Sequence, residues 1–250
     1  MTNFNKIDKA SRKFKFISKS KKFKFRFLPE WVLSEANYFE KEITSSKRNN
    51  KVYKRGALVF IDFGINVGNE LSGNHFGIVL NKHDSPKNGV LTVVPVSSKS
   101  NKFSIKIDGL IAQKSAKFLR TELMSLAAGL KVLQLHEVKD SLTEEEKIER
   151  TTTYSLSGNS YVEHYKYMDT VTFEKHVQQA QKELQELSAV QENYLKFDKV
   201  SYAKCLDIRT ISKDRIRKIN QFDPVGKISV SNETLNSIDK IILKNFTNNN

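Results

Sequence analysis

The first half of the chain alternates short apolar runs with polar turns. The runs are rich in Val, Ile and Phe, are separated by Gly, Asn, Asp and Pro, and lie at 53–63, 76–81, 90–97 and 103–109. Runs of this length between turn residues are typical of β-strands. Pro95, inside the third run, has no N–H for a sheet and indicates an edge, a bulge or a strand end. The pattern predicts an α+β protein with a small antiparallel β-barrel.

Basic and aromatic residues alternate along residues 13–28, KFKFISKSKKFKFRFL. Period-two alternation predicts an extended strand with one cationic and one aromatic face. Three interpretations stay open: the rings pack on the core, the segment contacts RNA phosphates and unpaired bases, or it is a disordered arm. The rings belong to Phe14, Phe16, Phe23, Phe25 and Phe27. Residues 34–46 then predict a short helix with Ser34 as its N-cap.

Apolar residues in the second half recur at intervals of three and four. One set lies within 116–133 and another within 177–194, which predicts two amphipathic helices. The polar segment 140–169 between them suggests a helical hairpin with a partly ordered tip. The two helices either pack on each other alone or form a dimerisation or partner surface.

The end of the chain resumes the pattern of short runs and turns. Residues 201–219 have strand and turn character, and residues 231–246 predict a closing helix. Ser231 is its expected N-cap, with an incomplete capping box because Thr234 occupies the N3 position.

The net charge of the chain indicates which kinds of partner it binds. The 250 residues carry a formal net charge of +14, and residues 1–29 hold ten Lys and Arg against one acid. Such an excess favours polyanionic partners, chiefly nucleic acid or anionic lipid. A single cysteine, Cys205, excludes an internal disulfide and indicates a reducing compartment, here the cytoplasm. No apolar run is long enough to span a membrane, and no secretory signal is expected.

Four separated pieces of sequence resemble one known family. They are RGALVFIDFG at 55–64, GNELSGNHFGIVL at 68–80, VVPVSS at 93–98 and IRTISKDRI at 208–216. In this order and spacing they resemble the MazF/PemK (Kid) family of toxin endoribonucleases of type II toxin–antitoxin systems. The resemblance covers residues 51–110 and 197–247. It implies a division into a basic N-terminal extension (1–50), a MazF/PemK-like barrel (51–110 with 197–250) and a helical insertion (111–196).

The resemblance also implies a function. Members of the family have an SH3-like, partly open barrel with a C-terminal helix, usually as a homodimer, and cleave single-stranded RNA at short motifs. An antitoxin with an acidic disordered segment is the expected protein partner, and DNA contact is expected in an autoregulatory toxin–antitoxin complex. A membrane partner is not expected.

Individual positions depart from the family pattern or agree with it. The family usually has an arginine before a proline after its G-x-E-x-x-G loop, where this chain has His75 and Phe76. Ser97 stands where threonine is usual, and Lys204 stands where some members have a basic residue. An acidic residue used nearby by some members falls on Leu206.

The chemistry of metal-free RNA cleavage suggests roles for these residues. A base must take the 2′-OH proton, an acid must protonate the leaving 5′-oxygen, and donors must stabilise the phosphorane. His75 suits the proton steps because its ordinary pKa is near 6.5. We expect His75, Ser97 and Lys204 to be catalytic. Expected RNA contacts are Asn66, Asn69, Glu70, Asn74, Ser98 and Arg209.

Several alternatives stay open. His75 acts in catalysis, positions or contacts a base, or is structural, and Arg209 either adds positive charge or fixes its turn by hydrogen bonds to carbonyls. Glu70 anchors the loop backbone or contacts a base, and His83 is expected to be solvated. No cofactor or metal motif is present, so neither is expected. The alternative function is a non-catalytic module that binds nucleic acid or inhibits a protein target, since this fold alone does not determine a chemistry.

Overall fold

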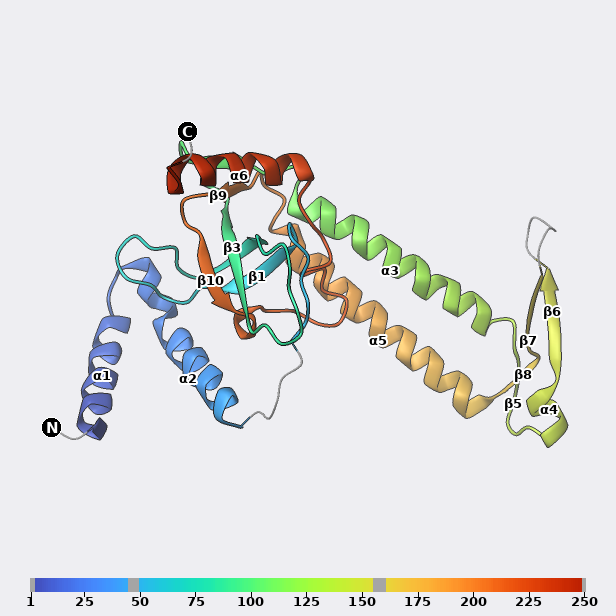
Figure 1. Cartoon of the computed structure of the whole chain (residues 1–250). Helices are drawn as coiled ribbons and strands as arrows, with labels where there is room; N and C mark the ends of the chain where they lie inside the picture. The colour runs from blue at the N-terminus through green and yellow to red at the C-terminus, as the bar shows by residue number, and fades with distance from the viewer. Residues whose placement is uncertain (1–2, 45–49, 155–160, 249–250) are drawn as a thin grey trace. The chain divides into compact units, whose positions relative to one another are not determined.

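The computed structural model describes residues 3–44, 50–154 and 161–248. The chain forms two compact units (Figure 1). The sheet unit contains the chain up to Ile111, Lys199–Lys218 and the chain from Pro224 onward. The helical unit contains Ala112–Asp198 and Ile219–Asp223.

The N-terminal arm of the sheet unit is helical. Helix α1 spans Asn3–Ser18, the 3-10 helix η1 spans Phe23–Phe27, and helix α2 spans Leu28–Thr44. The predicted strand at 13–28 is therefore wrong, and the predicted helix at 34–46 begins earlier, so Ser34 is not its N-cap. A lone strand needs a neighbour for its backbone hydrogen bonds, whereas a helix forms them within itself. Four of the five rings do not pack on the core either, because Phe14, Phe16, Phe23 and Phe27 are exposed, whereas Phe25 is partly buried.

An antiparallel sheet forms the centre of this unit. Its strands follow the order β1-β2-β3-β9-β4, and β10 pairs with β3. The strands are β1 (Leu58–Asp62), β2 (Asn74–Val79), β3 (Val90–Ser97), β4 (Ser104–Lys106), β9 (Tyr202–Lys204) and β10 (Arg209–Ser212). Helices and antiparallel strands together confirm the α+β class. Barrel closure is not confirmed, because among the described strands no pairing joins β1 to β4. Beside β1 there are isolated bridges, from Ile61 to Ile216 and from Ala57, just before the strand, to Ser229.

Strand β3 changes its neighbour halfway along. Its first half pairs with β10 as far as Val93, and its last two residues pair with β9 from Val96 onward. Pro95 lies in the gap between these partners, opposite Gly77 of β2. The missing N–H of Pro95 therefore costs no ladder hydrogen bond, which agrees with a local edge position.

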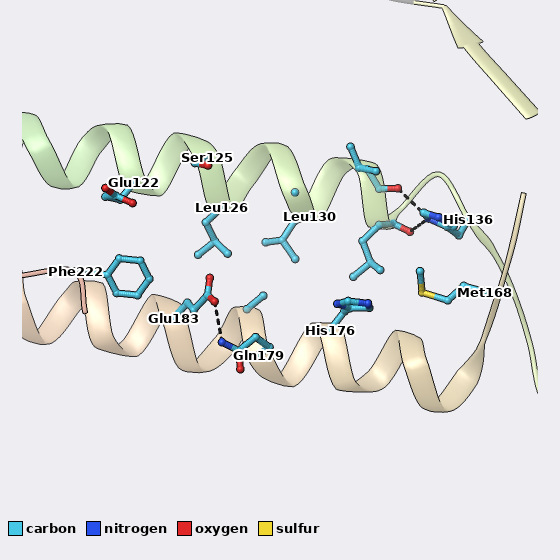
Figure 2. Close-up of a pocket in the computed structure, with 14 residues that line it drawn as sticks. Glu122, Ser125, Leu126, Leu130, His136, Met168, His176, Gln179, Glu183 and Phe222 are labelled. Atoms are coloured by element: carbon cyan, nitrogen blue, oxygen red, sulfur yellow. Dashed lines mark hydrogen bonds between the residues drawn. The ribbon is translucent and has the colours of Figure 1, made fainter. Parts of the chain in front are cut away.

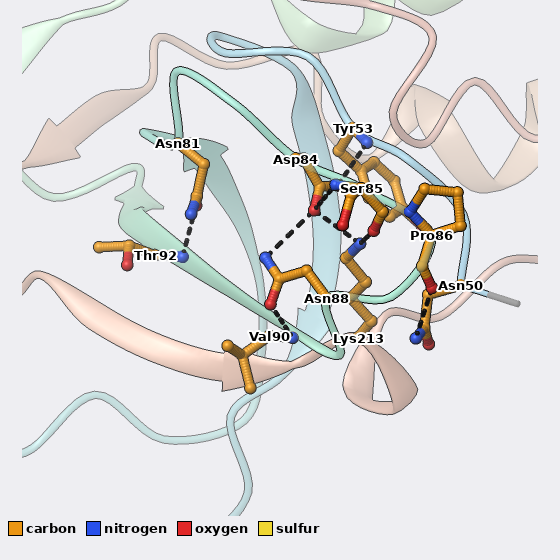
Figure 3. Close-up of polar contacts among 10 residues, drawn as sticks. All are labelled: Asn50, Tyr53, Asn81, Asp84, Ser85, Pro86, Asn88, Val90, Thr92 and Lys213. Carbon is orange, nitrogen blue, oxygen red and sulfur yellow. Dashed lines mark hydrogen bonds and ion pairs between the residues drawn. The ribbon is translucent and has the colours of Figure 1, made fainter. Parts of the chain in front are cut away.

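A buried ion pair closes the turn between β2 and β3 (Figure 3). Asp84 accepts hydrogen bonds from the backbone N–H of Tyr53 and of Ser85, at 2.8 and 2.9 Å. Lys213, in the 3-10 helix η2 (Lys213–Arg215), places its Nζ 2.8 Å from Asp84 Oδ1. The side chains of Lys213 and Asp84 are 5% and 0% exposed. The pair fixes η2 against the turn, and η2 directly follows β10.

Helix α6, Asn232–Phe246, closes the sheet unit and confirms the predicted C-terminal helix. The Ser231 hydroxyl accepts the backbone N–H of Thr234 at 3.2 Å, as expected for the N-cap. Arg55 pairs with Asp239 of this helix at 2.6 Å, and Leu235 lies against Gly56. These contacts hold α6 on the chain segment that leads into β1.

The helical unit is built on two long helices, α3 (Ile111–Leu133) and α5 (Thr170–Leu195), which confirms both predicted helices. Beyond the predicted hairpin, the intervening segment contains a short helix and two small sheets: β5 pairs with β8, and β6 with β7. They are β5 (Glu137–Lys139), α4 (Glu144–Ile148), β6 (Arg150–Tyr154), β7 (Tyr161–Tyr165) and β8 (Tyr167–Asp169). No helix of the described residues is long and apolar enough to cross a membrane.

Candidate functional site

Strand register places the predicted catalytic residues on one face of the sheet. Gly77 of β2 lies opposite Pro95 of β3, and His75 and Ser97 are each two residues away from this pair. Ser97 lies opposite Tyr202 of β9, and Lys204 is two residues beyond Tyr202. Opposed residues, and residues two apart in a strand, share a face. The side chains of His75, Ser97 and Lys204 therefore project from the same face of three neighbouring strands.

Arg209 belongs to the same face. It lies opposite Val93, and Val93 belongs to the buried cluster that also contains Ile61, Val79 and Ile211. The guanidinium of Arg209 lies 5.9 Å from the centroid of the Phe63 ring, and the centroids of the His75 and Phe63 rings lie 6.4 Å apart. The Phe63 ring thus lies near both the imidazole of His75 and the guanidinium of Arg209. Pattern analysis did not single out Phe63, although it ends an apolar run directly before a glycine.

His75 is half-buried, and the backbone carbonyls of Ser72 and Val96 interact with its ring. Its Nε2 lies 3.2 Å from the carbonyl oxygen of Ser72. Burial lowers the pKa of His75 below its usual value of 6.5, while the carbonyls of Ser72 and Val96 offset part of this shift. A neutral imidazole is consequently the main form at neutral pH, and a neutral imidazole can accept a proton.

The loop between β1 and β2 is held by its own side chains and by Arg209. The Asn66 amide donates to the carbonyls of Phe63 and Leu71, at 3.0 and 2.6 Å. Arg209 donates to the Leu71 carbonyl at 3.5 Å and pairs with Glu70 at 3.6 Å. Asn66, Glu70 and Arg209 are thus brought together at this loop, in contacts that shape its backbone.

The remaining predicted residues lie around this face and loop. Ser97 accepts the backbone N–H of Lys99 at 3.1 Å through its hydroxyl, and Ser98 beside it is exposed. Asn69 lies in the exposed part of the loop. Asn74 is exposed, but it lies opposite Asp62 and so faces the other side of the sheet from His75.

The N-terminal arm contacts the same loop from outside. Lys24 Nζ donates to the carbonyls of Asn66 and Gly68, at 3.0 and 2.8 Å. The ring of Trp31 packs on Gly64, where a Cβ atom would meet ring carbons at 2.4 to 2.6 Å. The basic and aromatic character of this arm is visible in the sequence but its contact with the loop is not, because the two segments are about forty residues apart.

The helical unit has a cavity of its own, of about 450 Å³, between α3 and α5 (Figure 2). Leu126 and Leu130 project into it from α3, and His176 projects from α5. Its lining is mostly apolar, with Glu122 and Glu183 at one side. None of the predicted site residues lines it, so the candidate site is the face and loop of the sheet unit.

Residues 54–150 match a protein family described as the PemK-like, MazF-like toxin of type II toxin–antitoxin systems. The match contains β1 to β4, the loop that carries Glu70 and the strand that begins with Asn74 and His75. It does not extend to the piece at 208–216 that carries Arg209. A search of curated proteins gave no match to the chain.

Proposed function

We propose that the protein is a toxin that cleaves single-stranded RNA, because residues 54–150 match the family described as the PemK-like, MazF-like toxin of type II toxin–antitoxin systems. The observation that carries the proposal is the shared sheet face of His75, Ser97, Lys204 and Arg209. A proton-transfer group, a hydroxyl donor and two cations are the groups that phosphodiester cleavage requires.

In the proposed reaction the ribose 2′-oxygen attacks the adjacent phosphorus. A bond forms between O2′ and phosphorus, the bond from phosphorus to O5′ breaks, and the products are a 2′,3′-cyclic phosphate and a 5′-hydroxyl. Neutral His75 takes the 2′-OH proton, and a water molecule supplies the proton that the leaving 5′-oxygen gains. Ser97 donates a hydrogen bond to a phosphate oxygen, and Lys204 and Arg209 stabilise the developing negative charge. No metal ion is needed in this scheme.

The lowered pKa of His75 gives the scheme a pH signature. Because the imidazole is the active form as a base, the cleavage rate should rise with pH and level off once His75 is deprotonated. Burial moves this midpoint below the ordinary value of 6.5. The rate should therefore be independent of pH near neutrality and fall only on the acid side.

The test is cleavage of a single-stranded RNA by the purified full-length protein in EDTA, with the chemistry of the new ends determined. His75→Ala and His75→Gln should each lower the rate at least about 100-fold, which is the usual contribution of a catalytic acid or base. Glutamine keeps an N–H that can donate to the Ser72 carbonyl, so its effect separates proton transfer from positioning. His83→Ala is the matched control, because His83 is exposed in a turn. Normal cleavage by His75→Gln would refute the role of His75.

The hydrogen bond between His75 and the Ser72 carbonyl also favours a second candidate. In this candidate the contacts of the His75 ring with the carbonyls of Ser72 and Val96 only hold the loop in position. The protein is then a non-catalytic module that binds nucleic acid or inhibits a protein target. Salt-sensitive RNA or DNA binding without cleavage products would support this candidate against the first.

The family membership implies an antitoxin as a protein partner. We extend the proposal to an antitoxin with an acidic disordered segment, to a homodimer, to DNA contact in an autoregulatory complex, and to action in the cytoplasm. We also propose that residues 1–50 are a basic extension and 111–196 an insertion into the toxin fold. Asn69, Asn74 and Ser98 remain the proposed base or backbone contacts, since all three side chains are exposed.

A further inference from the structure

A cavity of about 510 Å³ lies between the N-terminal arm and the loop that joins β1 to β2. We propose that it binds an unpaired nucleobase of single-stranded RNA, stacked on the aromatic rings of the arm. Its volume lies within the range of about 300–1,000 Å³ that is usual for small-molecule sites. The binding proposal stands on the cavity alone, and only its consequence for cleavage rests on the proposed function.

Aromatic rings form the arm side of this cavity. Phe23 and Phe27 belong to η1, and their ring centroids lie 5.5 Å apart in an edge-to-face arrangement. These two side chains are 70% and 48% exposed, and Trp31 lines the cavity beside them. Exposed rings next to a hollow are the usual platform for an unstacked base, since every base has a π-face.

Charged and polar groups surround the rings. Lys24 and Arg217 line the cavity, and Lys24 is held at the loop by two backbone carbonyls. Arg217 pairs with the buried Asp62 at 3.0 Å, yet half of its side chain remains exposed. Two fixed cations beside a stacking surface suit a nucleotide. The cations contact its phosphate, and the rings stack on its base.

The same groups argue against an apolar occupant. A peptide side chain or an acyl chain that filled the cavity would cover Lys24, Glu30 and Asn74 without giving their polar atoms new partners. Burial of polar groups without hydrogen bonds is unfavourable. A nucleobase instead has an apolar face for the rings and a polar edge for these side chains.

The acceptors on the wall suggest which base is preferred. Asp62 already accepts from Arg217, Tyr38 and the Gly64 backbone N–H. Glu30, an exposed residue of α2, also lines the cavity. A carboxylate accepts well from an exocyclic amino group. We therefore expect adenine or cytosine to bind more tightly than uracil, which lacks such a group.

The cavity and the catalytic face flank the same strand end. Asn74 lines the cavity, and His75 follows it directly with its side chain on the opposite face of β2. A base in the cavity therefore belongs to a nucleotide near the cleaved bond rather than to the one that is cleaved. Binding of a base in the cavity would therefore determine which phosphodiester bond of the RNA is cleaved.

Trp31 supplies the measurement, because it is the one tryptophan of the chain. The full-length protein is titrated with 2′-O-methyl oligonucleotides of A, C or U, which cannot be cleaved because the 2′-oxygen is blocked. Saturable quenching of Trp31 fluorescence is expected, with A and C binding more tightly than U, and a matched duplex should not quench. Glu30→Ala should remove the preference over U.

The variants identify the site of quenching. Phe23→Ala combined with Phe27→Ala should weaken binding about tenfold or more, in line with the loss of stacking. Because both rings are exposed, their truncation leaves the core intact, which circular dichroism verifies. Phe16→Ala is the matched control, since Phe16 is 79% exposed on α1 and does not line the cavity. Absence of quenching by every oligonucleotide, or equal quenching in the double variant, would overturn the proposal.

The outcome separates this proposal from the proposed function. Quenching by uncleavable strands without any cleavage of natural RNA would keep the base pocket and reject the ribonuclease. Cleavage without quenching would keep the ribonuclease and reject the pocket. Where both hold, the double variant should still cut RNA but with an altered choice of site.

Discussion

Replacement of Lys213 by methionine should destabilise the sheet unit by about 3 kcal/mol, because it leaves the Asp84 carboxylate buried without its cation. The two side chains are 5% and 0% exposed and lie 2.8 Å apart. Removal of one member of a buried ion pair usually costs about 3–5 kcal/mol. The lower end applies here, since Asp84 keeps hydrogen bonds from Tyr53 N–H, Ser85 N–H and the Asn88 amide (Figure 3).

The same pair predicts an acid-dependent loss of stability. Burial raises the pKa of Asp84, but the hydrogen bonds from Lys213, Tyr53 and Ser85 outweigh it, and the pKa is lowered overall. A carboxyl group with a lowered folded pKa contributes stability that is complete above its unfolded value, near 3.9, and is lost as pH falls through the folded value. Asp84→Asn should therefore be less stable near neutrality and lose less stability below about pH 4.

Urea unfolding followed by Trp31 fluorescence measures these effects, because Trp31 lies in the sheet unit. Lys41→Met is the control: Lys41 pairs with Asp214 at 3.1 Å but is 57% exposed, so the expected change is about 0–1 kcal/mol. The double variant Lys213→Met with Asp84→Asn should lose less than the two single losses added together. Equal midpoints for wild type and Lys213→Met would refute the reasoning.

Two further changes test how local features support the fold. Gly64→Ala should destabilise the packing of the arm on the loop by more than Gly68→Ala does. Both glycines have positive φ angles, of 75° and 59°, but only at Gly64 would a Cβ atom meet the Trp31 ring. A similar shift of Trp31 fluorescence in both variants would contradict this contact. Ser231→Ala should cost about 1 kcal/mol of urea stability through loss of the α6 N-cap, whereas Ser229→Ala, at an exposed position, should change little.

Elements with a strong local pattern could be predicted from the sequence. Strand β3 begins and ends where its apolar run does, and α6 begins after its predicted N-cap. The two long helices follow from apolar residues three and four apart. In each case neighbours along the chain carry the determining information, as turn residues, caps or one apolar face.

The arm at 13–28 could not be predicted in this way. Lys and Phe alternate there with period two, yet the residues form α1 and η1. Alternation decides between strand and helix only when one face is buried in a sheet, and here most of the rings are exposed. The small strands β5 to β8 were missed for a related reason: they are short and polar, and their pairing is not visible in local sequence.

The catalytic roles of the candidate site residues stay a prediction, and their arrangement could not be predicted from the sequence. Motif spacing pointed to His75, Ser97 and Lys204, and strand register then places them on one face. Arg209 pairs with Glu70 and lies near the Phe63 ring, and both contacts join segments more than a hundred residues apart in the chain. No local pattern contains such a contact.

The contacts of the β1–β2 loop imply that the residues of the family match alone do not define the proposed RNA-binding surface. The family match begins at residue 54, but Lys24 and Trp31 hold this loop from outside the match. Arg209 holds it from the opposite end of the chain, also outside the match. A loop fixed by an arm and by a distant strand has little freedom of its own. If the proposed function holds, substitutions in the arm or in β10 should therefore alter RNA binding while the proposed catalytic face stays unchanged.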